Sequence, residues 1–300
     1  MKITKLPNFL IVGTAKAGTS SVAKYLTSHP EVFIPELKEP RYFLHDVFEE
    51  VSKEDPMFNY LMESSVLDWN AYVDLYKQAD SRATMFGDAS IQYLYHHNTV
   101  IPKIKEKLGD VPIIIVLRDP VKRAFSNYKY QSNIEFLSFE EALNKEDEKK
   151  EKKYNSFWFY KDMGLYYNQV KAYIESFSNV HVCLYDDLIK SPEQFMGDIY
   201  AFLNIDNITA VDYTKRHNET VVPKNKPLQY INYIRNRFGI QLNFVPEKYR
   251  NALKNLFFQK NKEKIPQEEA QFLLPFFIDD IKKLEKLIDR DLSHWYTHAD

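Results

Sequence analysis

A glycine-containing loop between a short apolar run and a helical segment constrains the fold of this chain most. Residues 9–12, Phe-Leu-Ile-Val, form an apolar run that is typical of a buried strand. The loop that follows has glycines at positions 13 and 18, and residues 20–28 have the pattern of a helix that begins with serine. A strand, a loop and a helix N-terminus direct backbone N–H groups and the positive end of the helix dipole at one point. The sequence therefore predicts a site for a phosphate-like anion in this loop.

The position of the lysine distinguishes this loop from the phosphate-binding loop of nucleoside triphosphatases. That motif has lysine directly after its second glycine. Here Thr19 follows Gly18, and Lys16 lies inside the loop two residues before Gly18. The lysine charge favours a bound anion, but the same residues also fit an ordinary strand-to-helix turn with a solvated lysine. The loop alone leaves both interpretations open.

The composition allows one large domain and gives no signal for several classes of partner. The 300 residues are 44% hydrophobic, which is enough for a sizeable core. The net charge of −2 provides no general attraction to nucleic acid or membranes, and we expect neither as a partner. The N-terminus lacks an apolar leader, and no run of 18 apolar residues occurs, so we expect a cytoplasmic chain without a membrane span.

The single cysteine excludes an intramolecular disulfide and fits a reducing compartment. Cys183 lies in an apolar run, where a buried structural thiol is expected rather than a nucleophile. Because no cysteine and histidine residues have the spacing of a zinc site, we predict that the protein requires no metal.

Strand-like runs alternate with helical patterns along the chain. The strand-like runs are residues 9–12, 113–117 and 180–185, and the helical patterns are residues 100–107, 120–130 and 165–177. This alternation is typical of a parallel sheet with helices on both faces. We therefore predict an α/β fold, a single P-loop-like domain over residues 1–300 with a central parallel sheet. Helical insertions are expected at residues 45–80 and 138–156, followed by C-terminal helices.

Two further segments have clear patterns. Residues 146–153 form a dense run of mixed charge, which we interpret as a solvated helix face or a mobile loop. Residues 267–288 have a strong amphipathic helical pattern, and Pro275 is expected to divide or kink it.

A second cationic segment follows the strand-like run at residues 113–117. Arg118 stands at the carboxyl end of this strand, the sheet edge where open α/β folds bind ligands. On the helix that follows, Lys122, Ser126 and Lys129 share one face. A forked guanidinium and a hydroxyl at Arg118 and Ser126 suit a second phosphate. Alternatively, Arg118 pairs with a surface carboxylate and Ser126 is merely exposed. Two anion sites after two strands indicate a ligand with two separated anionic groups.

The two segments together resemble the signature of sulfotransferases that use 3′-phosphoadenosine 5′-phosphosulfate (PAPS). Residues 14–21, Thr-Ala-Lys-Ala-Gly-Thr-Ser-Ser, resemble that family's loop for the 5′-phosphosulfate. Residues 117–120, Leu-Arg-Asp-Pro, together with Ser126 resemble its segment for the 3′-phosphate. Residues 185–188, Tyr-Asp-Asp-Leu, resemble a third segment whose tyrosine lies near the adenine.

The stretch between the two phosphate segments resembles carbohydrate-type members of the family, which include heparan sulfate and many bacterial sulfotransferases. The similar residues are Ser-His-Pro-Glu-Val at 28–32 and Lys-Glu-Pro-Arg-Tyr-Phe at 38–43. Where heparan-type members often have Glu-Lys-Ser/Thr-Pro, this chain has Asp-Ala-Ser-Ile at 88–91, so one cation of those members is missing. Asp88 is a further candidate for acceptor binding or base chemistry.

The resemblance implies transfer of a sulfuryl group from PAPS to an acceptor hydroxyl or amine, most simply of a carbohydrate, with adenosine 3′,5′-bisphosphate as the second product. It implies that Lys16 lies at the leaving phosphate and that Glu39 is the catalytic base. Without the resemblance, a solvated loop carboxylate beside Lys38 and Arg41 is the favoured interpretation of Glu39. The residues expected at the nucleotide are Thr14, Lys16, Ala17, Gly18, Thr19, Ser20, Arg118, Ser126, Tyr185, His217 and Lys224.

Two other functions are compatible with parts of the sequence. An ATP-dependent small-molecule kinase would use a carboxylate after a strand for magnesium, and Asp119 has that position, although Lys16 has the wrong one. A non-catalytic nucleotide-binding protein would use the insertions as an interaction surface. Magnesium dependence with ATP binding would favour the first, and nucleotide binding without turnover would favour the second.

Overall fold

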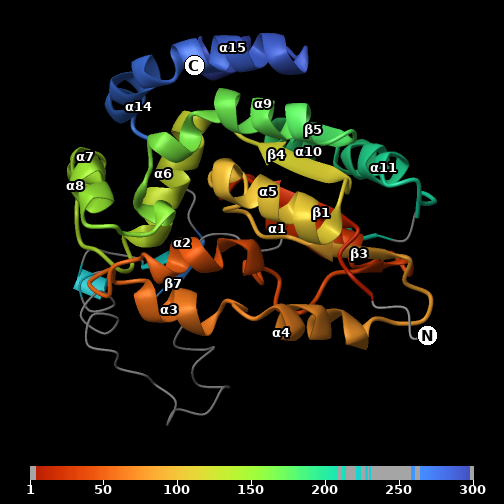
Figure 1. The fold of residues 1–300 in the computed structure, drawn as a ribbon. Coiled ribbons are helices and arrows are strands. Elements are labelled where there is room, and N and C mark those ends of the chain that lie inside the picture. The colour runs from red at the N-terminus through yellow and green to blue at the C-terminus, as the bar shows by residue number, and fades with distance from the viewer. Residues whose placement is uncertain are drawn as a thin grey trace.

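Five parallel strands form the central sheet of the protein (Figure 1). The computed structural model describes residues 5–208, 211–213, 221–223, 227, 228, 230, 258–260 and 264–297. The strand order is β2-β3-β1-β4-β5, with β1 at Phe9–Gly13, β2 at Val32–Phe33, β3 at Met85–Asp88, β4 at Ile113–Leu117 and β5 at Val180–Leu184. The predicted α/β fold with a central parallel sheet flanked by helices is therefore confirmed.

Side chains of the central strands alternate between two cores, one on each face of the sheet. Phe9 and Ile11 of β1 face one core, whereas Leu10 and Val12 face the other. The first core contains side chains of α1 (Thr19–Leu26), α10 (Tyr185–Lys190) and α11 (Pro192–Phe202). The second contains side chains of α5 (His97–Leu108), α6 (Pro120–Gln131) and α9 (Tyr166–Ser176). Burial on both faces explains why these strands are apolar at every position.

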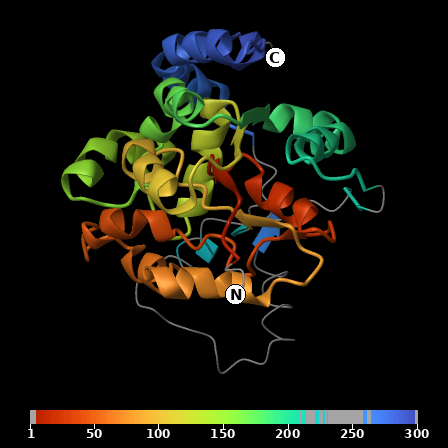
Figure 2. The ribbon, with the colours of Figure 1, turned by 45° about the vertical axis from the view of Figure 1, so that its right-hand side comes forward.

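Short helices occupy the two segments that were expected to be insertions. The first contains α2 (His45–Glu49), α3 (Phe58–Glu63) and α4 (Trp69–Asp74), with 3-10 turns at Tyr42–Leu44 and Leu75–Gln78. Figures 1 and 2 both show these helices, drawn in orange, on the opposite side of the molecule from the blue C-terminal helices. The second contains α7 (Phe139–Asn144) and α8 (Glu146–Glu151), followed by 3-10 turns at Ser156–Trp158 and Asp162–Gly164.

The charged run at residues 146–153 is not a fully solvated helix face. Glu146 is completely buried and accepts hydrogen bonds from the backbone N–H groups of Lys161 at 2.8 Å and Asp162 at 3.0 Å. Lys149 is also buried and pairs with Glu135. The sequence interpretation was wrong for these two residues, because α8 packs one turn of charged side chains against polar partners that are distant in sequence.

The C-terminal helices pack over α9. The pattern at residues 267–288 forms α14 (Gln267–Leu273), a 3-10 turn at Leu274–Phe276 and α15 (Ile278–Ile288), so the predicted break at Pro275 is confirmed. Helix α15 lies on α9 (Figure 1), and α16 (Ser293–Tyr296) follows it. A separate antiparallel pair consists of β6 (Val221–Pro223) and β7 (Phe258–Lys260).

The carboxyl ends of the strands bring the predicted site segments to one edge of the sheet. Residue 14 follows β1, Asp88 ends β3, Arg118 follows β4 and Tyr185 follows β5. Since the strands are parallel, all four positions lie at the same edge, where open α/β sheets bind ligands.

Candidate active site

The loop between β1 and α1 turns sharply through two residues with left-handed backbone. Thr14 anchors its start, because its N–H donates to the carbonyl of Val116 on β4 at 2.8 Å. Lys16 has φ of 68° and Gly18 has φ of 84°. A Cβ atom at Gly18 would lie 2.9 Å from Cδ2 of Tyr185, so both the dihedral angle and the close contact require glycine there.

Helix α1 begins directly after this glycine, and no side chain caps its first turn. In that turn Thr19 is buried and Ser20 is half-buried. Ala17 is a buried residue of the loop, and its N–H donates to the carbonyl of Thr14 at 3.3 Å. The first N–H groups of a helix have no partner inside the helix. The loop therefore presents the amide groups that an anion binds.

Arg118 connects this loop to the segment after β5. Its Nη1 donates to the carbonyl oxygen of Lys16 at 2.8 Å, and its guanidinium carbon lies 4.8 Å from the centroid of the Tyr185 ring. Three segments that the sequence analysis treated separately thus meet around one guanidinium group. This arrangement leaves the planar fork of Arg118 oriented by a carbonyl and a ring face.

Lys16 carries the second cation of this cluster. Its ammonium nitrogen lies 4.7 Å from the centroid of the Tyr130 ring on α6. Burial and the neighbouring charge of Arg118 lower the pKa of Lys16 to about 8, although Glu39 acts in the opposite direction. A bound phosphate or sulfate group stabilises two adjacent cations at a helix N-terminus. The residues present therefore fit the 5′ end of PAPS.

Helix α6 carries the remaining residues of the second predicted segment. Ser126 is half-buried on this helix. Asp119 caps the helix, because its carboxylate accepts hydrogen bonds from the N–H groups of Val121 at 2.9 Å and Lys122 at 3.2 Å. In the parts of the chain that the structure describes, no group of three histidine, cysteine, aspartate or glutamate residues is placed to hold a metal ion.

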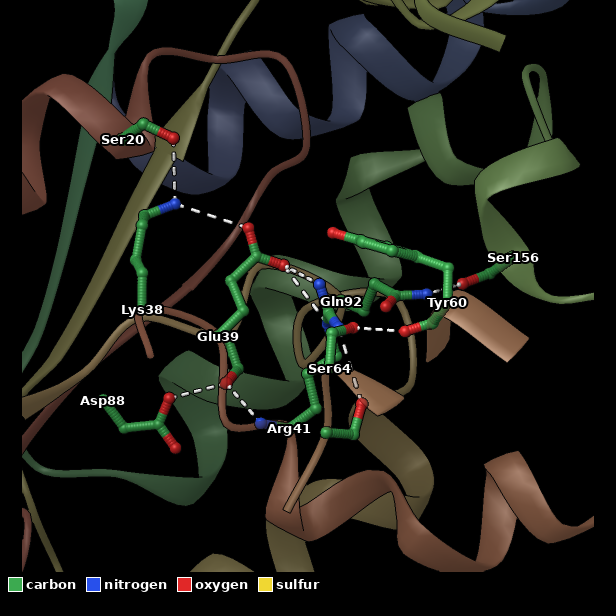
Figure 3. A network of polar contacts seen from close by, with 11 residues as sticks. Ser20, Lys38, Glu39, Arg41, Tyr60, Ser64, Asp88, Gln92 and Ser156 are labelled. Carbon is green, nitrogen blue, oxygen red and sulfur yellow. Dashed lines mark hydrogen bonds and ion pairs between the residues drawn. The ribbon is translucent and has the colours of Figure 1, made fainter. Parts of the chain in front are cut away.

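Glu39 lies in the loop after β2, held by a cation on each side (Figure 3). Lys38 Nζ lies 2.9 Å from Ser20 Oγ and 3.4 Å from Glu39 Oε1. Arg41 Nη2 lies 2.9 Å from Glu39 Oε2, with Nε at 3.3 Å from the same oxygen. Lys38 therefore bridges the first turn of α1 and the candidate base. The sequence analysis assigned no role to Lys38 or Arg41, although both flank Glu39 in the motif.

The two cations control the ionisation of Glu39. Burial alone would raise its pKa, but Lys38 and Arg41 outweigh burial and hold the pKa below the usual value of a glutamate. The side chain is only 18% exposed. Glu39 is therefore a carboxylate at neutral pH, in a paired site and not the solvated loop position of the alternative interpretation.

Asp88 lies behind this site and is completely buried. Its carboxylate accepts hydrogen bonds from the hydroxyl groups of Ser90, Tyr72 and Tyr93. The burial of Asp88 and its three hydroxyl partners give no support to the acceptor binding or base chemistry that the sequence left open for it. Of the other expected site residues, His217 and Lys224 lie outside the described residues.

The buried thiol of Cys183 has a structural position, as expected. Its Sγ lies 3.4 Å from the carbonyl oxygen of Ile115 on the neighbouring strand. Burial raises the pKa of Cys183 far above that of a reactive thiol.

These features define an α/β protein with two charged groups at the carboxyl edge of its parallel sheet. One is a cationic loop that leads into the N-terminus of a helix, and the other is a carboxylate that pairs with two cations. The chain belongs to the sulfotransferase family, since the family model described as the sulfotransferase domain matches residues 6–240. The family resemblance found in the sequence is therefore confirmed.

Similar proteins support the same family. A solved sulfotransferase from Alicyclobacillus acidocaldarius is 30% identical, with a TM-score of 0.75 over 97% of this chain and 99% of that chain. The membrane-associated sulfotransferase kil1 of Dictyostelium discoideum is 28% identical over 130 residues, which are 43% of this chain and 24% of that protein. Bifunctional heparan sulfate N-deacetylase/N-sulfotransferase 3 of Mus musculus is 24% identical over 215 residues, which are 67% of this chain and 22% of that protein.

The chain spans under a quarter of the length of these two curated relatives. Within the residues that the structure describes, none of the helices combines the length and the apolar character that crossing a bilayer requires.

Proposed function

We propose that this chain transfers a sulfuryl group from PAPS to a hydroxyl or amine of a carbohydrate acceptor. The observation that carries the proposal is the meeting of three elements at one sheet edge. These are the cationic loop around Lys16, the Arg118 guanidinium beside Tyr185, and the carboxylate of Glu39, which Lys38 links to the loop through Ser20. Family membership supports the same reaction class.

The family resemblance implies a role for each side chain, and the charge of each side chain is compatible with that role. PAPS supplies the sulfuryl group and two phosphate groups. Arg118 and Ser126 would bind the 3′-phosphate, and the first turn of α1 with Thr19 and Ser20 would hold the 5′-phosphate. The Tyr185 ring would lie against the adenine.

The reaction itself needs a cation for the departing phosphate oxygen and a base for the acceptor proton. Lys16 would stabilise the developing negative charge, and ionised Glu39 would accept the proton. Lys38 bonds both Ser20 and Glu39, so it would fix the distance between the donor and the base.

A carbohydrate acceptor is supported by the motif around Glu39 and by the name of the mouse relative, which specifies heparan sulfate. A kinase reaction is disfavoured, because the carboxylate of Asp119 caps α6 and already binds two backbone N–H groups.

The first test is ligand binding followed by thermal unfolding. Adenosine 3′,5′-bisphosphate at about a hundred times its Kd should stabilise the protein by roughly 2.7 kcal/mol. AMP, which lacks the 3′-phosphate, should stabilise it much less. Stabilisation by ATP with magnesium but not by the bisphosphate would overturn the proposed donor.

The second test measures transfer from radiolabelled PAPS to a panel of desulfated glycosaminoglycans and simple sugars. Glu39→Gln should lose about 10²–10⁴-fold in rate, the usual contribution of a general base, and should still bind the bisphosphate. Glu36→Gln is the matched control, since Glu36 is an exposed glutamate three positions away. Equal rates in the two variants would exclude Glu39 as the base.

A further inference from the structure

A buried carboxylate behind the candidate base accepts hydrogen bonds at both of its oxygen atoms. Asp88 ends β3 and is completely buried. Its Oδ1 accepts a hydrogen bond from Ser90 Oγ at 2.6 Å, and its Oδ2 accepts from the hydroxyl groups of Tyr72 at 2.7 Å and Tyr93 at 3.0 Å. Three hydroxyl donors thus fix the orientation of this carboxylate.

Ser90 passes this orientation on to the loop that carries Glu39. Its hydroxyl has one hydrogen, and that hydrogen is donated to Asp88. The oxygen lone pair of Ser90 consequently accepts the backbone N–H of Arg41, with an N–O distance of 3.0 Å. Figure 3 shows this chain of contacts from Asp88 to Arg41 below the Glu39 side chain.

Arg41 is fixed at both its backbone and its side chain. Its φ of 55° is a left-handed conformation that costs a non-glycine residue energy, so surrounding contacts must hold it, and the hydrogen bond from its N–H to Ser90 is one of them. Its guanidinium binds Glu39 Oε2 through Nη2 and Nε, and Nη1 donates to Ser64 Oγ at 2.9 Å. The charge that orients Glu39 therefore depends on a backbone conformation that Ser90 stabilises.

We propose that Asp88 and Ser90 form a buried relay that positions Arg41 and, through it, the carboxylate of Glu39. Both are positioning residues, because neither reaches a substrate. This inference rests on the proposed role of Glu39 as base. A base on a loop needs such support, since catalytic groups must be held within about 0.5 Å of their working geometry.

The relay is tested by the ionisation of Glu39 itself, which requires no acceptor. NMR of labelled glutamate carboxyl carbons gives the pKa of each glutamate, and Glu39→Gln identifies the signal. In Ser90→Ala, the looser pairing with Arg41 should raise the pKa of Glu39 by roughly 0.5 unit or more, since intact pairs lower carboxyl pKa values by about 1–3 units.

The matched control is Tyr76→Phe. Tyr76 is equally buried in the same cluster, but its hydroxyl donates to the carbonyl of Gly87 at 3.2 Å. Among the described contacts, no hydrogen bond joins this hydroxyl to Asp88, Ser90 or Arg41. This variant should leave the pKa of Glu39 unchanged. If Ser90→Ala does not fold, Ser90→Cys keeps the volume, weakens the same hydrogen bonds and should shift the pKa in the same direction.

An unchanged pKa of Glu39 in a folded Ser90 variant would overturn the relay. So would an equal shift in Tyr76→Phe, because the effect would then be a general loosening of the core. Thermal stabilisation by adenosine 3′,5′-bisphosphate is measured on the same samples. This measurement separates the relay from the proposed function. If the wild-type chain does not bind the bisphosphate, the proposed donor is wrong, but the pKa comparison for Glu39 still tests the relay.

Discussion

Lys16 is half-buried and lies near Arg118, and both burial and this neighbouring charge disfavour its protonated form. Burial and Arg118 together bring the pKa of Lys16 to about 8. A bound phosphate favours the protonated form, so binding of the nucleotide and protonation of Lys16 are linked. The site is thus built for an anionic ligand at the level of a single side chain.

The linkage predicts that nucleotide affinity depends on pH. The affinity for adenosine 3′,5′-bisphosphate should decrease as the pH rises through about 8, because binding then requires Lys16 to take up a proton. Titration calorimetry from about pH 6.5 to about pH 9.5 measures this decrease, and Lys16→Met should bind more weakly and lose this dependence. A wild-type dependence that persists in the variant would assign the proton to another group.

The sequence predicted that the segments of Lys16 and Arg118 would meet, but it did not predict the contacts around Glu39. The glycine spacing, Lys16 and Arg118 follow recognisable strands, so their convergence could be predicted from the parallel topology. The contact of Lys38 with Ser20 joins residues 18 positions apart through a loop of irregular shape. No periodic pattern specifies such a loop, and the relay from Asp88 to Arg41 likewise spans two separate elements.

Helix α1 depends on a glycine at its start for both its geometry and its contact with the third site segment. Gly18→Ala would place a methyl group 2.9 Å from Tyr185 Cδ2 and 3.0 Å from Leu188 Cδ2, at a φ of 84°. The added methyl group would displace the Tyr185 ring or the Leu188 side chain, in addition to straining the backbone. We expect this variant to lose adenosine 3′,5′-bisphosphate binding by at least about tenfold, equivalent to 1.4 kcal/mol.

Gly109→Ala separates the backbone strain from the contact. Gly109 has a φ of 78°, but a Cβ atom there would meet nothing within 4 Å. This control should lower the free energy of unfolding by about 1–3 kcal/mol through strain alone and should leave nucleotide affinity unchanged. A similar loss of affinity in both variants, measured by calorimetry, would show that Gly18 acts only through stability.

The sequence predicted three of the five strands, and two of these three, β1 and β4, are buried at every position. Strands β1, β4 and β5 have near-continuous apolar sequences, whereas β2 has two residues and β3 reads Met-Phe-Gly-Asp. Short strands that lie toward one edge of a sheet carry little periodicity, and their pairing depends on the strands beside them. Asp88 belongs to β3, so its burial could not be predicted without this element.

Two buried groups give the whole molecule opposing responses to acid. Burial lowers the pKa of His96 to about 4, so acid favours the unfolded chain, whose histidines titrate near 6.5. Burial raises the pKa of Asp88 to about 6, although hydrogen bonds from its three hydroxyl partners act against this shift. As the pH falls, Asp88 is protonated in the folded chain before it is protonated in the unfolded chain. The contribution of Asp88 to the free energy of unfolding therefore increases as the pH falls from about 6 to about 4.

His96→Gln should expose this balance. The variant removes the contribution that is lost between about pH 6.5 and about pH 4, so its thermal unfolding midpoint should fall less on acidification than that of the wild type. His97→Gln is the control, because its ring nitrogen bonds the nearby carbonyl of Tyr95 and its charge is a smaller cause of the lowered pKa of His96 than burial is. Parallel pH profiles for wild type and His96→Gln would contradict the expected role of this histidine.

The C-terminal helices contact the segment after β5, which contains Tyr185. The indole nitrogen of Trp295 donates to Asp186 Oδ2 at 2.9 Å, and Arg290 Nη2 lies 2.8 Å from Asp187 Oδ2. Both carboxylates follow Tyr185, whose ring lies against Arg118. The orientation of α10 is thus fixed by residues far along the chain.

This connection has a consequence for protein synthesis. The ribosome completes both phosphate segments and Tyr185 long before it adds Trp295, which is 109 positions after its partner Asp186. A nascent chain that still lacks residue 295 has every predicted donor-binding residue, but α10 has no clamp. Donor binding should therefore be weaker until α15 and α16 have left the ribosome and docked, which makes the nucleotide a probe for that docking step.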